Sequence, residues 1–422
     1  MRRHLRAALG PHRNLTIAVV LLLLTVGFAV ASGYWLMYRM AYGLFLLLPL
    51  SYLWARYNVS GLRVEVDRSV DRVEAGHEAE SRITVTNTGR FRKLWLEVED
   101  ASDLPGYAPR RVMSLGGGGH RTWRIRVRCL HRGLYRVGPV RITSSDPFGL
   151  FRFSREFGRP GAVLVYPPYA DLSRFAVPPA NLPGDGRYRR RTHYVTPNAA
   201  GVREYHYGDS FNRIHWKSTA RTGELMVKMF ELDPSSDVWI LHDLHRDAQA
   251  GRGEESTEEY GVRVVASIAR YFLLANRSVG YIGFGADLDV VEADRGPQQF
   301  TRILEALALA RARGDVPFSD LITEESRRFG RHTTVVAVTP ATDDSWVLAL
   351  QGLSQRGVRV AAVLLEPETF GSSRTSLLVY GTLAAGEVLT YSIKRGDDIG
   401  AVLEGRSVAA EAAEAARPPR AE

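Results

Sequence analysis

Cysteine is nearly absent from this sequence of 422 residues, because Cys129 is the only one. A single cysteine excludes an intrachain disulfide, and it cannot supply the ligands of a cysteine-based zinc cluster. This cysteine content suits a reducing compartment. Folded regions must therefore be stabilised by apolar cores, and hydrophobic residues make up 45% of the chain, which is enough to build them.

Acidic residues are also in deficit, since 46 Asp and Glu stand against 55 Lys and Arg for a formal charge of +9. An excess of this size raises the question of nucleic-acid binding. Most of the excess is arginine spread along the chain, and the sequence contains neither a lysine-rich arm nor a recognisable nucleic-acid-binding module. We therefore expect no nucleic-acid partner.

Charge is missing altogether from residues 14–38, where the core reads LTIAVVLLLLTVGFAVAS. A second apolar run, MAYGLFLLLPLSYLWA, lies between Arg39 and Arg56. Crossing a bilayer takes roughly 20 apolar residues. The pattern predicts a membrane hairpin over residues 1–56, with spans at about 15–32 and 36–55, so that the lipid bilayer is an expected partner.

The distribution of arginine predicts how this hairpin is oriented. Four arginines precede the first span (Arg2, Arg3, Arg6 and Arg13), four follow the second (Arg56, Arg63, Arg68 and Arg72), and only Arg39 lies between them. Because cations favour the cytoplasmic side, both ends are predicted there, which gives a multi-pass plasma-membrane protein with cytoplasmic soluble domains. The alternative is a signal peptide cleaved after Ala31, and it leaves the side of the soluble part unchanged.

Short segments in which apolar and polar residues alternate follow the hairpin, and the turn sequences NTG, LPG, GGGG and DPFG separate them. This pattern of short strands and turns predicts a β-sandwich-like domain over residues 57–160. The alternation puts Arg124, Arg126 and Arg128 on one strand face, which we interpret as a solvated outer face, a docking face being the alternative. The run from Gly116 to Gly119 has no lysine or helix after it, so it predicts a hairpin and not a phosphate loop.

The remainder of the chain divides into three predicted segments. A linker rich in proline and arginine, together with a charged block, occupies residues 161–231. Strands such as SDVWILHDL and HTTVVAVTP then alternate with helical patterns such as TEEYGVRVVASIARYFLLAN, which predicts a parallel α/β domain over residues 232–405. A disordered tail is expected at 406–422. The predicted fold class is therefore multidomain α+β.

Two stretches carry a family resemblance. RGLYRVGPVRITSSDPFGLF at 132–151 and AGVREYHYGDSFNRIHWKSTARTGELMVKMFE at 200–231 resemble the domain-of-unknown-function-58 family of bacterial membrane proteins. The resemblance implies that the C-terminal α/β domain is similar to von Willebrand factor A. It also implies association with MoxR-type AAA+ ATPases. It supplies no established catalytic residue.

The same resemblance raises the question of a metal site. Domains similar to von Willebrand factor A often bind magnesium through an Asp-x-Ser-x-Ser triplet after the first strand, and the corresponding residues here run from Asp243 to Asp247 as DLHRD. Only the leading aspartate is present, although Asp320 and Thr323 could approach from later loops. We expect no metal and no cofactor, and we interpret Asp243, the one weak candidate, as a residue that binds loop amides.

The charged block REYHYGDSFNRIHWK at 203–217 has the raw material of a catalytic site. A hydrolase would use His206 or His215 as base with Ser210 or Ser218 as nucleophile, yet no Gly-x-Ser-x-Gly elbow is present. Two histidines nine residues apart are too few for a metal site. We therefore expect no catalytic residue, and we assign the block to bracing and to partner binding. The assigned residues are Arg203, Glu204, Tyr205, Gly208, Asp209, Arg213, His215, Trp216, Lys217 and Arg221.

Within the block we expect a division of roles. Trp216 and Asp209 are predicted to brace the fold, whereas Arg203, His215 and Lys217 are predicted to bind. The sequence then indicates a membrane-anchored cytoplasmic scaffold or adaptor, not an enzyme, whose partners are an AAA+ ATPase and other membrane or cytoplasmic proteins. The alternative is a hydrolase or ligand-binding receptor that uses the α/β domain.

Overall fold

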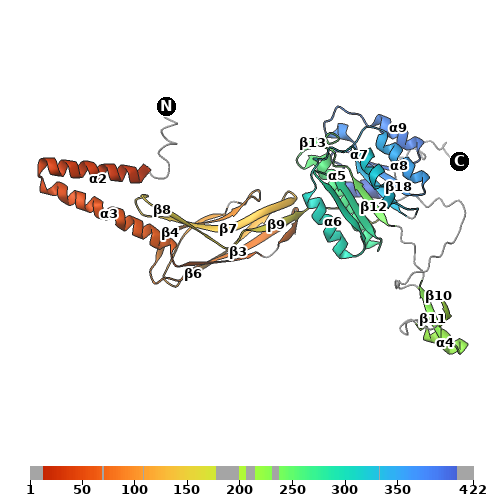
Figure 1. Cartoon of the computed structure of the whole chain (residues 1–422), viewed down its shortest axis with the longest axis horizontal. Helices are drawn as coiled ribbons and strands as arrows, with labels where there is room; N and C mark the ends of the chain where they lie inside the picture. The colour runs from red at the N-terminus through yellow and green to blue at the C-terminus, as the bar shows by residue number, and fades with distance from the viewer. Residues whose placement is uncertain are drawn as a thin grey trace, which may run out of the picture. The chain divides into compact units, whose positions relative to one another are not determined.

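A computed structural model describes residues 13–68, 71–107, 109–176, 199–205, 214–230, 237–331 and 333–405. The chain divides into two compact units, Met1–Tyr166 and Pro167–Glu422, which Figure 1 colours from red to yellow and from yellow to blue. The tail at 406–422, for which disorder is predicted, lies outside the described residues.

Two long apolar helices open the first unit: α2 (Arg13–Ser32) and α3 (Trp35–Val59). Both are long and apolar enough to cross a membrane, and most of their apolar side chains are exposed, as at Leu24 and Phe45. Gly33, between the helices, has a φ of +63°, which suits glycine because it lacks a Cβ. The prediction of two apolar helices is confirmed, and their passage through a membrane stays a prediction.

The β-rich part of this unit contains two sheets. One has the order β1 (Leu62–Arg68), β3 (Glu78–Asn87) and β6 (His120–Arg128). The other has the order β2 (Arg72–Glu74), β9 (Gly161–Tyr166), β7 (Gly133–Ser145), β4 (Lys93–Ser102) and β5 (Arg110–Leu115), with β8 (Arg152–Phe157) also paired to β7. One cluster of buried apolar side chains takes members from both sheets, among them Val85, Leu96 and Ile142. These residues alternate with outward-facing ones, as the period of two requires.

The arginine row of β6 lies on an outer face. Arg124, Arg126 and Arg128 are exposed, and the first two form ion pairs with Glu80 on β3 at 3.4 and 3.1 Å. Trp123 of the same strand is half-buried and packs against the core. The exposed arginines fit the interpretation of a solvated sheet face.

Two predicted boundaries need correction. The β-rich unit does not end at residue 160, because β9 pairs with both β7 and β2 and extends it to Tyr166. Residues 167–176 are not a free linker either. Phe175 is 3% exposed and stacks on Tyr391 with 5.0 Å between ring centroids, and the Ala170 amide donates to Ser267 Oγ at 2.9 Å. This segment therefore belongs to the second unit.

The second unit is built around a six-stranded sheet of order β16-β15-β12-β17-β18-β19, in which only β16 is antiparallel to its neighbour. If the strands are numbered along the chain from β12, the order is 3-2-1-4-5-6. The strands are β12 (Val238–His242), β15 (Val279–Phe284), β16 (Leu288–Asp294), β17 (Thr334–Thr339), β18 (Arg359–Leu365) and β19 (Leu389–Ile393). Two short strands, β13 (Gly251–Arg252) and β14 (Glu255–Ser256), form a separate hairpin. The alternation of strand and helix predicted from the sequence is thus confirmed as a mixed α/β fold.

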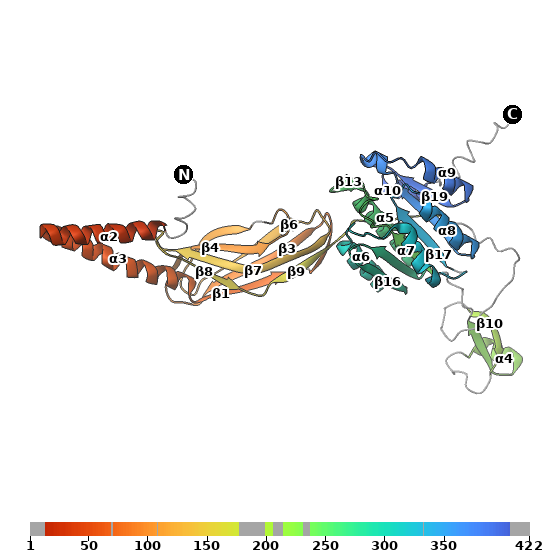
Figure 2. The same cartoon turned by 45° about the horizontal axis from the view of Figure 1, so that its top comes forward.

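Helices cover this sheet: α5 (Thr257–Leu274), α6 (Pro297–Leu309), α7 (Phe318–Glu325), α8 (Ser345–Gln355), α9 (Leu377–Ala385) and α10 (Ile399–Glu404) (Figure 2). Trp239 and Leu241 of β12 share a core cluster with apolar residues of α7, α8 and α9. Their neighbour Ile240 points to the opposite face, because side chains alternate along a strand. Every residue of β12 and β17 is buried, as expected of strands at the centre of a covered parallel sheet.

A small module carries the charged block. Strands β10 (Ala199–Glu204) and β11 (Met226–Phe230) form an antiparallel pair, and helix α4 (Trp216–Thr222) precedes β11. The pair is a sheet of its own and does not join the six-stranded sheet. Helix α4 ends at Gly223, which caps it with a φ of +78°.

The junction between α3 and the β-rich fold depends on Lys93. Its side chain is 1% exposed, and its Nζ donates to the Tyr57 carbonyl oxygen at 2.5 Å and lies 3.2 Å from the centre of the Tyr57 ring. The last carbonyls of a helix have no partner within the helix and carry partial negative charge, so a cation stabilises them. Burial lowers the pKa of Lys93, because removing the ammonium group from water destabilises its charged form.

We expect Lys93→Met to lower the free energy of unfolding by about 1 to 3 kcal/mol, because a buried carbonyl loses its charged donor. Denaturant titration of the full chain in detergent, followed by circular dichroism, measures this loss. Arg92→Met is the matched control, since Arg92 is exposed and adjacent in sequence. Equal stability of the two variants would show that Lys93 does not stabilise the junction.

Candidate functional site

The carboxyl ends of the parallel strands bring polar residues to one edge of the six-stranded sheet. Asp243 follows β12, Thr339 ends β17, Glu366 follows β18 and Lys394 follows β19. In open α/β sheets this edge is where ligands bind, because the loops there diverge around the strand ends. The described residues form two polar clusters at this edge.

The first cluster is centred on Asp243, which is 2% exposed. Its Oδ2 accepts a hydrogen bond from Thr339 Oγ1 at 2.5 Å, and its Oδ1 accepts one from the His245 amide at 2.9 Å. Thr339 Oγ1 in turn accepts from the Ala341 amide at 2.9 Å. Burial is the largest influence on this carboxyl and raises its pKa from 3.8 to about 6, against the opposing effect of the two hydrogen bonds.

This donor set does not fit magnesium. Both oxygens of Asp243 already accept hydrogen bonds, and the two triplet positions that need hydroxyls hold His245 and Asp247. Octahedral Mg²⁺ needs several oxygen ligands with room for water. Over residues 13–405, leaving aside the undescribed gaps, no three His, Cys, Asp or Glu side chains are grouped as a metal site. The geometry matches the interpretation of an aspartate that binds a loop amide.

Asp320 and Thr323, considered as additional ligands, have other partners. Both lie on α7, where Asp320 Oδ1 accepts from Ser319 Oγ at 3.2 Å and Thr323 Oγ1 donates to the Ser319 carbonyl at 2.8 Å. The hydroxyl that does reach Asp243 is that of Thr339, 96 positions away in the sequence. The sequence analysis missed Thr339, although its place at the end of a predicted buried strand was a usable signal.

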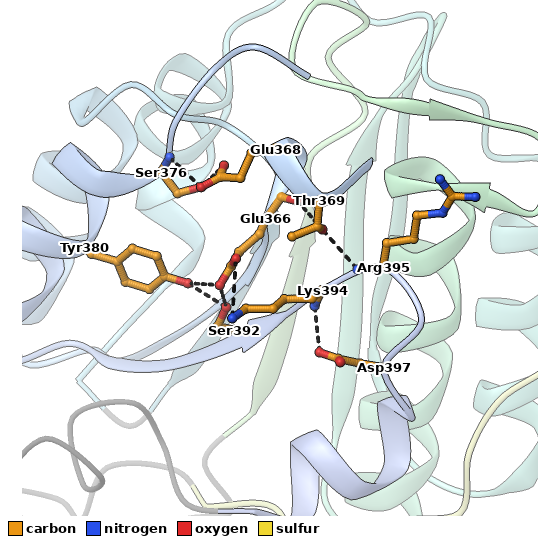
Figure 3. Close-up of polar contacts among 9 residues, drawn as sticks. All are labelled: Glu366, Glu368, Thr369, Ser376, Tyr380, Ser392, Lys394, Arg395 and Asp397. Carbon is orange, nitrogen blue, oxygen red and sulfur yellow. Dashed lines mark hydrogen bonds and ion pairs between the residues drawn. The ribbon is translucent and has the colours of Figure 1, made fainter. Parts of the chain in front are cut away.

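The second cluster is centred on Glu366, 9% exposed at the end of β18 (Figure 3). Tyr380 Oη lies 2.7 Å from Glu366 Oε1 and 2.5 Å from Ser392 Oγ, and Ser392 Oγ also donates to Glu366 Oε1. Lys394 Nζ lies 4.0 Å from Glu366 Oε2. Burial, with the neighbouring Glu366 carboxylate in addition, raises the pKa of Tyr380 well above its ordinary value.

The rim of this cluster ties the loops after β18 and β19 together. Glu368 Oε2 accepts from Ser376 Oγ at 2.9 Å, Thr369 Oγ1 accepts from the Arg395 amide at 3.0 Å, and Asp397 accepts from the Lys394 amide at 2.8 Å (Figure 3). These hydrogen bonds lie at the exposed or partly buried edge of the cluster, and the one between Thr369 and Arg395 links the two loops to each other. Sequence analysis missed this network because its central members, Glu366, Tyr380 and Ser392, come from three separate segments.

The signature module is held together by a small apolar contact and by backbone hydrogen bonds. Ile214 and Val227 are 4% and 3% exposed and lie opposite each other across an antiparallel bridge. The His215 amide donates to the Met226 carbonyl at 2.7 Å, and the Tyr205 amide donates to the Leu225 carbonyl at 2.8 Å. These contacts fix α4 on the strand pair.

His215 caps this helix. Its Nδ1 accepts from the Ser218 amide at 3.2 Å and lies 2.7 Å from Ser218 Oγ. A serine hydrolase also needs a histidine beside a serine hydroxyl, but this pair is three residues apart and shares the amide contact of a helix N-cap. The structure thus gives His215, predicted to bind a partner, a structural role as well.

The remaining block residues divide by exposure. Trp216 is 68% exposed, so the prediction that it is a bracing anchor is wrong, and Ile214 fills the apolar position instead. Lys217 and Arg221 are exposed one helical turn apart, and Glu204 and Tyr205 lie at the end of β10. Arg203 pairs through its backbone with Val227, and its side chain lies outside the described structure, as do Gly208, Asp209 and Arg213 entirely.

These features define a mixed α/β protein with two N-terminal apolar helices and a separate, exposed signature module. The family model described as "Protein of unknown function DUF58" matches residues 201–369, from the signature module to the loop after β18. A relative, "Uncharacterized protein YeaD" of Bacillus subtilis (strain 168), is 26% identical over 311 residues, which are 71% of this chain and 75% of that protein. Both matches support the resemblance to the DUF58 family that the two quoted stretches predict.

Three solved structures are similar to parts of the chain. The CARDB domain of PF1109 from Pyrococcus furiosus is 21% identical, with 25% of this chain and 86% of that domain covered, at a TM-score of 0.19. The pilus adhesin SpaC from Lactobacillus rhamnosus GG is 11% identical, with 40% of this chain and 29% of that chain covered, at a TM-score of 0.31. The alkylpurine DNA glycosylase AlkC of Pseudomonas fluorescens is 14% identical at a TM-score of 0.19, with 27% of this chain covered, and this chain spans 35% of its length. At these scores the likenesses define neither fold nor function.

Asp243 predicts a measurable pH dependence of stability. The pKa of Asp243 is raised on folding from 3.8 to about 6, so the protonated carboxyl contributes to the free energy of unfolding. This contribution is fully present below about pH 4 and is lost as the pH rises through about 6. It amounts to on the order of 3 kcal/mol at most. Asp243→Asn should remove this part of the pH dependence and leave the protein at least as stable near neutral pH. Denaturant titrations at a series of pH values test this, with Asp320→Asn as the exposed control. If Asp243→Asn has the same pH profile of stability as the wild type, a group other than Asp243 causes the pH dependence.

Magnesium or manganese should leave the melting temperature of the purified chain almost unchanged, because a ligand stabilises the folded state only in proportion to its affinity for it. Differential scanning fluorimetry with and without the cation measures the shift. A rise of several degrees that Asp243→Ala abolishes would establish a metal site at this edge after all.

Proposed function

We propose that this DUF58 protein is a membrane-anchored scaffold or adaptor whose soluble units lie in the cytoplasm and whose signature module binds a partner protein. One observation carries the proposal: α4 presents Trp216 to solvent, beside the exposed cations Lys217 and Arg221. Tryptophan and arginine dominate the residues that supply binding energy at protein interfaces. The helix that presents them is held by the Ile214 contact and the His215 cap, so binding would cost little ordering.

The charge of this surface favours an acidic partner surface. Lys217 and Arg221 are four residues apart, which places them on one face of α4. A partner with carboxylates at matching spacing would be attracted at long range and then bound by hydrogen bonds from the guanidinium group. Among partners, the family resemblance favours a MoxR-type AAA+ ATPase, and we propose that the adaptor couples it to a process at the cell envelope or to the maturation of protein complexes.

The finer fold assignments are part of the same proposal. We propose that the β-rich unit is a β-sandwich, since its two sheets share one apolar cluster. We propose that the second unit is similar to von Willebrand factor A, since its strand order is 3-2-1-4-5-6 with one antiparallel edge strand. Such a unit without a fitting metal site would serve as a binding domain and not as a metal-dependent adhesion domain.

The orientation in the membrane rests on the arginine distribution described above. Arg13 begins α2, Arg56 lies in the last turn of α3, and Arg39 is the single cation near the connection between the helices. Cations concentrate on the cytoplasmic side of membrane proteins. The soluble units would then meet a cytoplasmic ATPase directly.

The combined variant Trp216→Ala, Lys217→Ala, Arg221→Ala should weaken binding of the purified MoxR-type ATPase from the same organism by at least about tenfold, which corresponds to about 1.4 kcal/mol. Its melting temperature should stay close to that of the wild type, because the three side chains are exposed. Surface plasmon resonance with the full chain in nanodiscs measures the affinity.

Two controls make the result specific. Glu224→Gln changes an exposed charge of the same module and should leave binding intact. His215→Ala should instead lower stability by about 1 kcal/mol through loss of the helix cap. If the triple variant is stable and binds the ATPase as tightly as the wild type, the proposed interface is wrong. Turnover of a substrate by the α/β unit would favour the hydrolase alternative.

A further inference from the structure

Both apolar helices meet the β-rich fold at the same end. The last turn of α3 is bonded to Lys93, the first residue of β4. At the start of α2, Asn14 Nδ2 donates to the Gly149 carbonyl at 3.3 Å in the loop between β7 and β8. This end of the fold carries two loops, residues 88–92 and residues 146–151, which we call the junction loops.

Aromatic contacts show where along the axis of α3 the second of these loops, residues 146–151, lies. The rings of Phe151 and Phe153 pack edge-on against Tyr52 with centroids 5.5 and 5.3 Å away. Because a helix rises 1.5 Å per residue and a hydrocarbon core about 30 Å thick takes about 20 residues, a span beginning at Trp35 ends close to Trp54. The loop that contacts Tyr52 therefore lies at the boundary between hydrocarbon and headgroups.

Each junction loop presents a large aromatic side chain to solvent. Phe148 is 58% exposed and Phe91 is 71% exposed, and Trp95, just beyond residues 88–92, is 51% exposed. The ring of Phe91 also lies edge-on to Tyr57 of α3, with 6.2 Å between centroids. Aromatic side chains of this kind are enriched at membrane interfaces, where an apolar ring can leave water.

The loops hold these rings outward in a fixed shape. Asp146 is 2% exposed and accepts from the Phe148 amide at 2.9 Å and from the Phe151 amide at 2.6 Å. Asn87 donates to the Phe91 carbonyl at 2.9 Å, which fixes the other loop. Exposed aromatics on ordered loops lose little conformational entropy when they enter another phase.

The charge around the rings has one sign. Arg90 and Arg92 flank Phe91 and are exposed, as are Arg13 and Arg56 at the helix ends. Residues 88–95 include no acid, and the only acid in 146–153 is the buried Asp146. A cation near an anionic lipid surface gains about 1 kcal/mol.

We propose that the junction loops form a lipid-binding surface. Phe148 and Phe91 insert into the interfacial layer of the leaflet where α2 begins and α3 ends, and Arg90 and Arg92 bind anionic phospholipid headgroups. This inference rests on the membrane anchoring in the proposed function, and it adds that the β-rich unit is seated on the bilayer surface.

The experiment uses the full chain in nanodiscs, with single cysteines labelled by the environment-sensitive fluorophore nitrobenzoxadiazole. Cys129 is fully buried, so the unsubstituted chain is the labelling blank. Phe148→Cys and Phe91→Cys probe the loops. Leu24→Cys, in the middle of α2, reports insertion of the helices. Leu134→Cys is the matched exposed apolar control, 55% exposed and roughly 35 Å along β7 from its junction end.

With phosphatidylcholine and phosphatidylglycerol in the nanodisc, labels at 148 and 91 should shift to the blue and be quenched by lipids that carry a nitroxide near the headgroup. The label at 134 should stay unquenched. Arg90→Glu together with Arg92→Glu should reduce quenching at 91 at least twofold, and phosphatidylcholine alone should have the same effect.

The outcomes separate this inference from the anchoring on which it rests. Quenching at 24 without quenching at 148 and 91 overturns the lipid-binding surface and leaves the anchored adaptor standing. No quenching at 24 overturns the anchor itself. Equal quenching at 91 with and without anionic lipid overturns the role of the two arginines.

Discussion

The N-terminal unit depends on how the carbonyl end of α3 is neutralised where that helix enters the β-rich fold. Lys93 places a buried ammonium group against the Tyr57 carbonyl, and Asn58 accepts from the Leu94 amide at 3.4 Å beside it. A helix end buried without such partners would leave carbonyls unpaired. Because Lys93 begins β4, which pairs with both β5 and β7, this contact joins the end of α3 directly to the sheet.

In the C-terminal α/β unit, the polar side chains at the strand ends form hydrogen bonds with one another. Asp243 is bonded to Thr339 and the His245 amide, and Glu366 is bonded to Tyr380 and Ser392. A network of this kind stabilises the strand ends and presents few free ligands. Exposed side chains lie instead on α4 of the signature module, and the binding function proposed above rests on them.

The sequence predicted the fold well where periodicity was strong. Helix α5 and strands β12 and β17 were predicted because their apolar residues recur with the period of a helix or form short apolar runs typical of buried strands. The edge strand β16 and helix α9 were missed: LDVVEAD carries three acids, and LLVYGTLAA has no polar face to mark it as helical. The segment at 167–176 was misjudged as linker because its prolines hide the burial of Phe175, which depends on Tyr391 more than 200 positions away.

The sequence by itself determined the two apolar helices, the alternation of the α/β unit, the resemblance to the DUF58 family and the lack of a hydroxyl triplet after Asp243, since each is a property of neighbouring residues. Only the tertiary structure decided that Thr339 reaches Asp243, that Glu366, Tyr380 and Ser392 form one network, and that Ile214 and not Trp216 is buried. These depend on which strands become neighbours and which face of a short helix meets its sheet. Local spacing does not encode such contacts, because residues far apart in the sequence make them.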